Sequence, residues 1–176
     1  MPTVCVVDID TTIANNDHRA VLLQRDENGN IPQESWDAFL QPDLMVLDSV
    51  QEHVVDVLNH MRGHGFRVVF LTGRNIKYFD NTADWLRKHV EWNELTEPLL
   101  MRRLTDVNVP ASQCKEALFL DYVKRNNLEH STFLFFEDDK HVMSVWRKYG
   151  LVFQCPEAWC WMNPELPSHP ESSWNR

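Results

Sequence analysis

Five short apolar runs recur along the chain, and the stretches between them carry helical spacing or turn residues. The runs are TVCVV (3–7), RVVFL (67–71), PLLM (98–101), FLFF (133–136) and LVFQ (151–154). Short runs of this kind are typical of strands that are buried on both faces of a sheet. The segments with helical spacing are Val50–Arg62, Tyr78–Val90, a stretch that Ser112 is expected to cap and that runs to about Arg125, and Val142–Tyr149. This alternation predicts an α/β fold with a mostly parallel five-stranded sheet covered by helices, a three-layer Rossmann-like arrangement.

The alternation of predicted strands and helices stops between residues 15 and 48. We interpret this segment as an insertion that forms a small cap. Within it, Ser35 is expected to cap a short helix that carries Trp36 and Phe39, and QPD (41–43) marks a break. We expect residues 1–155 to form one core with this insertion. Residues 156–176 hold four prolines and three tryptophans and are expected to be a tail that packs on the core or extends from it.

Composition narrows the class of protein. A chain of 176 residues favours a single domain, and no apolar run approaches the ~18 residues needed to span a bilayer. The N-terminus lacks a basic lead-in, and the cysteines are scattered without a CxxC pair, so we expect reduced thiols and a cytoplasmic protein. A net charge of −9 argues against non-specific binding to a long nucleic-acid duplex, although it does not exclude contact with one strand end.

Polar side chains follow the apolar runs at the points where the predicted strands end. Asp8 and Asp10 follow the first run, Thr72 and Arg74 the second, and Asp138 and Asp139 the fourth. Ligands of such sheets bind beyond the carboxyl ends of the strands, so these groups are expected to meet there. Two like charges ~4 Å apart repel by about 4 kcal/mol at an effective dielectric of ~20, so the four carboxylates require a cation. An all-oxygen set of ligands favours Mg²⁺.

The same residues resemble the motifs of haloacid dehalogenase phosphatases. DIDTT (8–12) is similar to their DxDxT signature, FLTGR (70–74) to their second motif, Lys115 to the third and FFEDD (135–139) to the fourth. Any one of these motifs is weak, but all four occur in order and at expected strand ends or helix starts. The resemblance covers roughly residues 3–155 and implies a haloacid dehalogenase fold.

The resemblance also implies roles for individual residues. Asp8 would be the nucleophile that forms an aspartyl-phosphate, and Asp10 the general acid and base. Thr72 and Lys115 would bind the oxygens of the transferring phosphoryl group. Asp8, Asp138 and Asp139 would hold Mg²⁺, with Asp10 contributing its backbone carbonyl. Each role has an ordinary alternative. Asp8 and Asp10 could be carboxylates of a turn, and Lys115 could be a solvated surface lysine. The EDD run (137–139) could cap the start of a helix, and Glu137 is expected to be structural.

Among branches of the family, the chain resembles the 3′-phosphatase domain of phage polynucleotide kinases. The shared segments are TGR (72–74), MRR (101–103), VWRKYGL (145–151) and, in the insertion, DHRAVL (17–22) and SWDAFL (35–40). Two departures are Thr11, where the family usually has Gly, and the segment PASQC (110–114) before Lys115, where relatives of this branch commonly have an acid. Candidate substrate-binding residues are Thr12, His18, Arg19, Gly73, Arg74, Arg102 and Arg103.

Aromatic residues have two interpretations. Trp36 and Phe39 would stack a base if they face the site, although aromatic residues at helical spacing are more often core. Trp85, Trp92 and Trp146 are assigned to packing.

Three functions remain open from the sequence. The first is Mg²⁺-dependent hydrolysis of a phosphomonoester on a nucleotidyl substrate, preferentially the 3′-phosphate of a polynucleotide end, in the host cytoplasm if a phage encodes the chain. The second is a 5′-nucleotidase that acts on free nucleoside monophosphates, which the negative charge favours. The third is an inactive domain that binds a nucleotide or partner. No GxxxxGK[ST] motif is present, so a kinase activity is not expected in this chain. The oligomeric state does not follow from the sequence.

Overall fold

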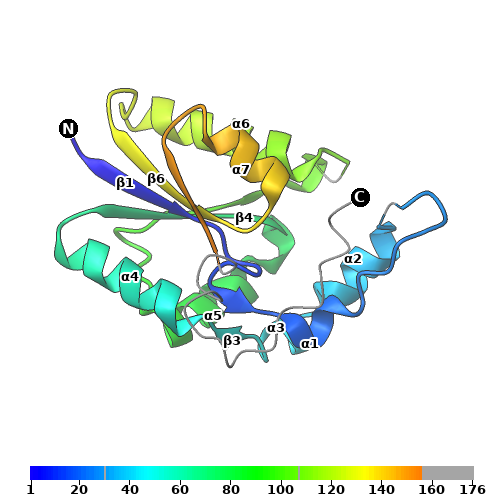
Figure 1. The fold of residues 1–176 in the computed structure, drawn as a ribbon. Coiled ribbons are helices and arrows are strands. Elements are labelled where there is room, and N and C mark those ends of the chain that lie inside the picture. The colour runs from blue at the N-terminus through cyan, green and yellow to red at the C-terminus, as the bar shows by residue number, and fades with distance from the viewer. Residues whose placement is uncertain (30, 107, 156–176) are drawn as a thin grey trace.

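The computed structural model describes residues 1–29, 31–106 and 108–155, and the predicted tail lies outside this part of the chain. Its main feature is a five-stranded sheet in the order β5-β4-β1-β6-β7 (Figure 1). The strands are β1 (Thr3–Val7), β4 (Arg67–Asn75), β5 (Leu99–Arg102), β6 (Thr132–Glu137) and β7 (Leu151–Gln154). All neighbouring strands in this sheet are parallel, which confirms the predicted α/β fold.

Two layers of helices cover the sheet, with α4 and α5 on one face and α6 and α7 on the other (Figure 1). The helices are α4 (Glu52–Gly63), α5 (Phe79–Val90), α6 (Ala111–Arg125) and α7 (Lys140–Trp146). Side chains of β1 alternate between the two faces: Cys5 and Val7 join one apolar cluster, and Val4 and Val6 join the other. Burial on both faces explains why the strand sequences are continuous apolar runs.

The strand order reverses at β1. β1 lies in the middle of the sheet, between β4 and β6. The chain adds β4 and then β5 on one side of β1, and it then crosses over to add β6 and β7 on the other side. In sheets of this kind ligands bind at the crevice beyond the carboxyl ends of the strands that flank the reversal, here β4, β1 and β6. Asp8 follows β1, Thr72 lies in the second half of β4, and Asp138 follows β6, so all three come from the carboxyl-terminal side of the sheet.

A small second sheet marks the two ends of the insertion. β2 (Ala14–Asn15) pairs antiparallel with β3 (Ser49–Val50). Between them the described residues form three short helices, α1 (Asp17–Ala20), α2 (Gln33–Phe39) and α3 (Pro42–Met45). The insertion therefore leaves and re-enters the core at one place, next to the crevice.

Several predicted boundaries differ from the structure. Neither predicted serine cap holds: α2 follows Pro32 and α6 follows Pro110, because a proline suits a position at a helix start. Val50 belongs to β3, so α4 begins only at Glu52. α7 begins at Lys140 and ends at Trp146, earlier than predicted at both ends.

The three tryptophans assigned to packing are buried, as predicted: Trp85, Trp92 and Trp146 are 3%, 6% and 2% exposed. Trp146 stacks on Phe135 with ring centroids 4.7 Å apart, which fastens α7 to β6. Among the described residues, none of the helices has the length and apolar character required to cross a membrane.

Candidate active site

The ends of β1 and β6 bring two predicted acidic groups together. Val7 of β1 is in register with Phe136 of β6, and the Asp8 N–H donates to the Phe136 carbonyl at 3.0 Å. The Thr12 hydroxyl lies 3.3 Å from Asp8 Oδ2 and 3.3 Å from Asp138 Oδ1. The aspartates at positions 8 and 138, distant in the sequence, therefore face one small space beyond the sheet.

Lys115 reaches the same space from α6. Its Nζ lies 2.7 Å from Asp8 Oδ1 and 2.8 Å from Glu137 Oε2, and its side chain is 5% exposed. Burial would lower the pKa of Lys115, but the charges of Asp8 and Glu137 outweigh that effect and raise it above the ordinary value. Lys115 is therefore a permanent cation beside the Asp8 carboxylate.

One lysine does not balance the acidic groups around it. Burial, with the nearby charges of Glu137 and Asp10, raises the pKa of Asp8 to about 7, although Lys115 lowers it in part. Burial and the charge of Asp8 also raise the pKa of Asp138 well above its usual range. A further positive charge beside them would lower both pKa values and favour the ionised forms. An oxygen-only set of donors that lacks charge balance fits Mg²⁺.

Carboxylate oxygens of Asp8, Glu137 and Asp138 lie within 4.8 Å of one another. Glu137, however, already accepts hydrogen bonds from Lys115 and from the Trp146 indole at 3.3 Å. Both carboxylate oxygens of Glu137 therefore already accept hydrogen bonds, and Glu137 holds the Lys115 side chain in place. Asp8 and Asp138 remain the side chains best placed to hold a metal ion.

Asp139 has a different contact from the one predicted. Its Oδ1 accepts from the N–H groups of His141 at 2.7 Å and Val142 at 3.2 Å, so it caps α7. This is the ordinary role that an acidic run at a helix start suggests. The cap contact occupies Oδ1 of Asp139 and orients the segment that carries Asp138.

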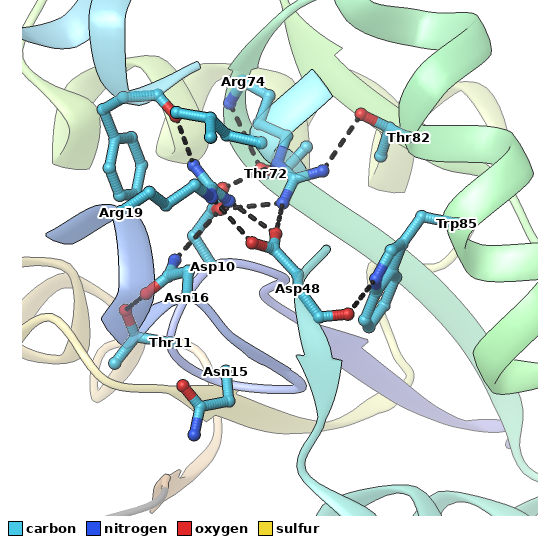
Figure 2. Close-up of polar contacts among 12 residues, drawn as sticks. Asp10, Thr11, Asn15, Asn16, Arg19, Asp48, Thr72, Arg74, Thr82 and Trp85 are labelled. Carbon is cyan, nitrogen blue, oxygen red and sulfur yellow. Dashed lines mark hydrogen bonds and ion pairs between the residues drawn. The ribbon is translucent and has the colours of Figure 1, made fainter. Parts of the chain in front are cut away.

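A second charged cluster lies around Asp10, which follows the same strand as Asp8 (Figure 2). Arg74 donates to Asp10 through Nε at 2.9 Å and Nη2 at 2.8 Å, and Arg19 donates through Nη2 at 2.7 Å. Both arginines also contact Asp48, and Asn16 donates to Asp10 at 3.2 Å. We call Asp10, Arg19, Asp48 and Arg74 the arginine clamp.

The clamp determines the charge of Asp10. Burial raises the pKa of this carboxyl, but Arg74 and Arg19 outweigh burial and hold the pKa well below its usual range. The prediction that Arg19 and Arg74 bind substrate is not supported by this arrangement. Both side chains are fully buried, and their hydrogen-bond donors point to Asp10, Asp48, the Phe39 carbonyl and Thr82. They hold Asp10 instead.

Thr72 lies within β4, which continues to Asn75 beyond the predicted strand end, and it is completely buried. Its hydroxyl oxygen accepts from the Arg74 N–H at 3.1 Å, which leaves the hydroxyl proton available to a ligand. The Gly73 carbonyl accepts from Arg102 Nε at 3.0 Å. The His18 ring nitrogen Nε2 lies 3.1 Å from the Leu44 carbonyl, so His18 joins α1 to α3.

The other two predicted arginines differ from each other. Arg102 donates from Nη1 to the carbonyls of Asp106 at 2.7 Å and Val109 at 2.6 Å, in addition to Gly73. It therefore shapes the segment between β5 and α6, and its predicted phosphate contact is not supported. Arg103 is 61% exposed and lies 3.8 Å from Asp121, so it remains available to an anionic ligand.

The two aromatic residues of α2 also differ. The Arg19 guanidinium lies 3.9 Å above the Phe39 ring, and Phe39 is 4% exposed, so it is a packing residue and not a base-stacking one. Trp36 contacts Phe39 edge-on and is 38% exposed.

Thr11, one of the two departures from the family pattern, adopts a left-handed backbone with φ of 66°. This region favours Gly and is unusual for a β-branched residue, which explains the family's preference. The Thr11 hydroxyl donates to Asn16 at 3.2 Å, a contact that Gly lacks. The other departure, the segment PASQC (110–114), contains the start of α6, and the first turn of that helix carries no acidic residue.

Comparison with known proteins gives a family. The family model described as the polynucleotide kinase PNKP phosphatase domain matches residues 2–158. No curated protein sequence matches the chain significantly.

Solved structures share the fold. A chain in a structure of the Pnkp1/Rnl/Hen1 complex is 23% identical with a TM-score of 0.62, over 88% of this chain and 45% of that one. A haloacid dehalogenase-like hydrolase from Streptococcus pneumoniae is 11% identical with a TM-score of 0.58, over 85% and 82% of the two chains. A phospho-aspartyl intermediate analogue of phosphoserine phosphatase is 14% identical with a TM-score of 0.54, over 87% and 86%.

The protein spans less than half the length of the Pnkp1 chain that it matches. The family model nevertheless covers the sheet, the insertion and every candidate site residue. The chain therefore belongs to the family of polynucleotide kinase PNKP phosphatase domains, a group of haloacid dehalogenase-type phosphatases.

Proposed function

We propose that the protein is a Mg²⁺-dependent phosphomonoesterase that works through an aspartyl-phosphate on Asp8. The observation that carries this proposal is the buried contact of 2.7 Å between Asp8 and Lys115 at the crevice, with Asp138 beside it. A carboxylate buried next to a fixed cation and a second acid is suited to nucleophilic attack on a phosphoryl group.

The reaction has two steps. Asp8 attacks phosphorus, the bond from phosphorus to the leaving oxygen breaks, and that oxygen takes a proton from Asp10. Water then attacks the aspartyl-phosphate, gives its proton to Asp10, and inorganic phosphate leaves as the Asp8 carboxylate is restored. Lys115 and Thr72 donate hydrogen bonds to the phosphoryl oxygens in both steps.

Mg²⁺ would be held by Asp8, Asp138 and the Asp10 backbone carbonyl, and it would neutralise charge on the phosphoryl oxygens. Asp10 is a carboxylate in the ligand-free protein, so it has to gain a proton before the first step. A bound phosphate dianion favours this proton, because its negative charges raise the pKa of a neighbouring carboxyl. The Asp10 side chain is 22% exposed, which leaves a path for the leaving group.

For the substrate we propose the 3′-phosphate of a polynucleotide end. The match to the PNKP phosphatase domain supports it. The insertion has only three short helices among its described residues, and we expect so small a cap to leave room for a strand end. A neighbour of the same fold belongs to the Pnkp1/Rnl/Hen1 RNA repair complex. The second candidate is a 5′-nucleotidase, which the net charge of −9 favours because long nucleic acid is repelled.

A panel of phosphomonoesters separates these substrates. We expect kcat/KM for a 3′-phosphorylated oligonucleotide to exceed that for 5′-nucleoside monophosphates by at least about 10-fold, because the oligonucleotide gains binding energy outside the crevice. Release of inorganic phosphate is the measurement. Faster turnover of the free 5′-monophosphates would favour the nucleotidase, and no hydrolysis of any substrate would favour an inactive binding domain.

Metal binding is expected to depend on pH. Without metal, the free energy of unfolding should fall as pH rises from about 4 to about 7, because the folded-state pKa of Asp8 is raised to about 7 and the unfolded chain ionises this group earlier. Mg²⁺ should restore that stability by about 2.7 kcal/mol at 100 times its Kd. The Tm increase on adding Mg²⁺ should therefore be larger at pH 8 than at pH 5.5. Asp138→Asn should remove most of the increase, and an equal increase at both pH values would contradict the proposed ligands.

A further inference from the structure

Asp48 is a buried carboxylate that none of the sequence motifs contains. It is the last residue before β3, and it is 1% exposed. Its Oδ1 accepts from Arg19 Nε at 2.7 Å, and its Oδ2 accepts from Arg19 Nη2 at 2.6 Å and from Arg74 Nη2 at 3.1 Å (Figure 2). Asp48 therefore holds Arg19 as a two-pronged pair and contacts Arg74 with the same carboxylate.

Charge balance requires this second carboxylate. Two buried guanidiniums face one Asp10 carboxylate, and without Asp48 the clamp would carry an uncompensated positive charge in a fully buried place. A guanidinium has a rigid planar set of donors, so a two-pronged contact fixes its orientation as well as its charge. Of the remaining donors, Arg19 Nη2 and Arg74 Nε and Nη2 point to Asp10. The Nη1 groups of the two arginines point instead to the Phe39 carbonyl and to Thr82.

The position of Asp48 is itself fixed from several elements. Its backbone carbonyl accepts from the Trp85 indole of α5 at 2.8 Å, and its N–H donates to the Met45 carbonyl at 3.2 Å. The next residue, Ser49, is in register with Asn15 at the other end of the insertion. The clamp is thus built from both ends of the insertion and is tied to the core by Trp85.

We propose that Asp48 is a positioning residue that acts through Arg19 and Arg74 to hold Asp10 at the place where it exchanges a proton with the leaving oxygen. This inference rests on the proposed function, since it requires that Asp10 is the acid of the first step. It also assigns a task to the insertion, which supplies half of the clamp and is therefore part of the catalytic centre.

The test compares two substrates whose leaving groups differ in their need for a proton. An alkyl ester such as an oligonucleotide 3′-phosphate needs protonation of its leaving oxygen, whereas 4-nitrophenyl phosphate releases a stable anion. For Asp48→Asn we expect kcat/KM to fall about 10²-fold for the alkyl ester, the scale of general acid catalysis, and less than about 3-fold for the aryl ester. Because kcat/KM reports the steps up to departure of the leaving group, the later hydrolysis of the aspartyl-phosphate does not enter.

The matched control is Glu97→Gln. Glu97 holds Arg62 in an equally tight two-pronged pair, at 2.6 and 2.8 Å, away from the crevice. It should lower stability without changing the ratio of the two substrates. Equal losses for both substrates in Asp48→Asn, or no loss for either, would overturn the proposal. Wild-type protein that hydrolyses neither ester would instead reject the proposed function itself, and the role of Asp48 with it.

A milder variant covers the case in which Asp48→Asn does not fold. Trp85→Phe removes the indole donor from the Asp48 carbonyl and keeps the aromatic packing of α5. We expect a loss of about 3- to 10-fold in kcat/KM that is confined to the alkyl ester, because a small displacement of catalytic groups lowers the rate. A loss shared by both esters would again overturn the proposal.

Discussion

Replacing Asp8 by Asn is expected to lower kcat by at least about 10⁴-fold, the scale seen when a catalytic nucleophile is removed. An amide cannot form the aspartyl-phosphate, and neighbouring carboxylates do not take its place, because Glu137 is held by Lys115 and Asp10 by the arginine clamp. Phosphate release under saturating substrate is the measurement. Asp56→Asn, an exposed aspartate of α4, is the control and should retain full activity.

The same variant should remain folded. Burial raises the pKa of Asp8 to about 7, so its charge is unfavourable in the metal-free protein at neutral pH and above. An asparagine amide is neutral, has nearly the same shape, and presents an oxygen to Lys115. At pH 8 without Mg²⁺, thermal unfolding should therefore show an unchanged or higher Tm. Substantial residual activity in this folded variant would mean that another group attacks phosphorus.

Lys115→Met is expected to affect both stability and activity. The lysine is the cation between Asp8 and Glu137, and removing one partner of such a buried set destabilises a protein by about 3–5 kcal/mol. Loss of a donor to the phosphoryl oxygens should lower kcat by about 10²- to 10³-fold. Chemical denaturation and phosphate release measure the two effects, and Lys124→Met, at an exposed position of α6, should change neither by much.

A double variant separates the two roles of Lys115. In Lys115→Met/Glu137→Gln the cation and one carboxylate are lost together, so most of the stability should return. Activity should not return, because the donor to the transferring phosphoryl group is still missing. Recovery of activity together with stability would show that Lys115 serves only to balance charge.

The sequence predicted much of the fold because strands buried on both faces must be apolar throughout, as in TVCVV of β1 and FLFF of β6. It also predicted that the candidate site residues lie at one edge of the sheet, since the carboxyl ends of parallel strands meet there. Asp8 and Asp138 directly follow β1 and β6, whereas Thr72 lies within β4 and Lys115 comes from α6. Helix starts were predicted less well, because the expected serine caps were replaced by prolines.

Which arginines face the crevice could not be predicted. Arg19 and Arg74 occupy positions that suggest phosphate contacts, yet Asp48 turns both guanidiniums toward Asp10. Asp48 lies at the junction of a loop-like insertion with the core, where hydrophobic periodicity gives no signal, and only the three-dimensional pairing of β2 with β3 places it there. Glu137 was expected to be structural, and its structural task proved to be the orientation of a candidate catalytic lysine.

A crystal structure with Mg²⁺ and beryllofluoride, a mimic of the phosphoryl group, would test the convergence of Asp8 and Asp138 most directly. We expect beryllium bonded to one carboxylate oxygen of Asp8, and Mg²⁺ at about 2.0–2.1 Å from the other Asp8 oxygen and from Asp138. Lys115 should contact a fluorine atom. Beryllofluoride on another residue, or an ion bound without both aspartates, would contradict the proposed chemistry.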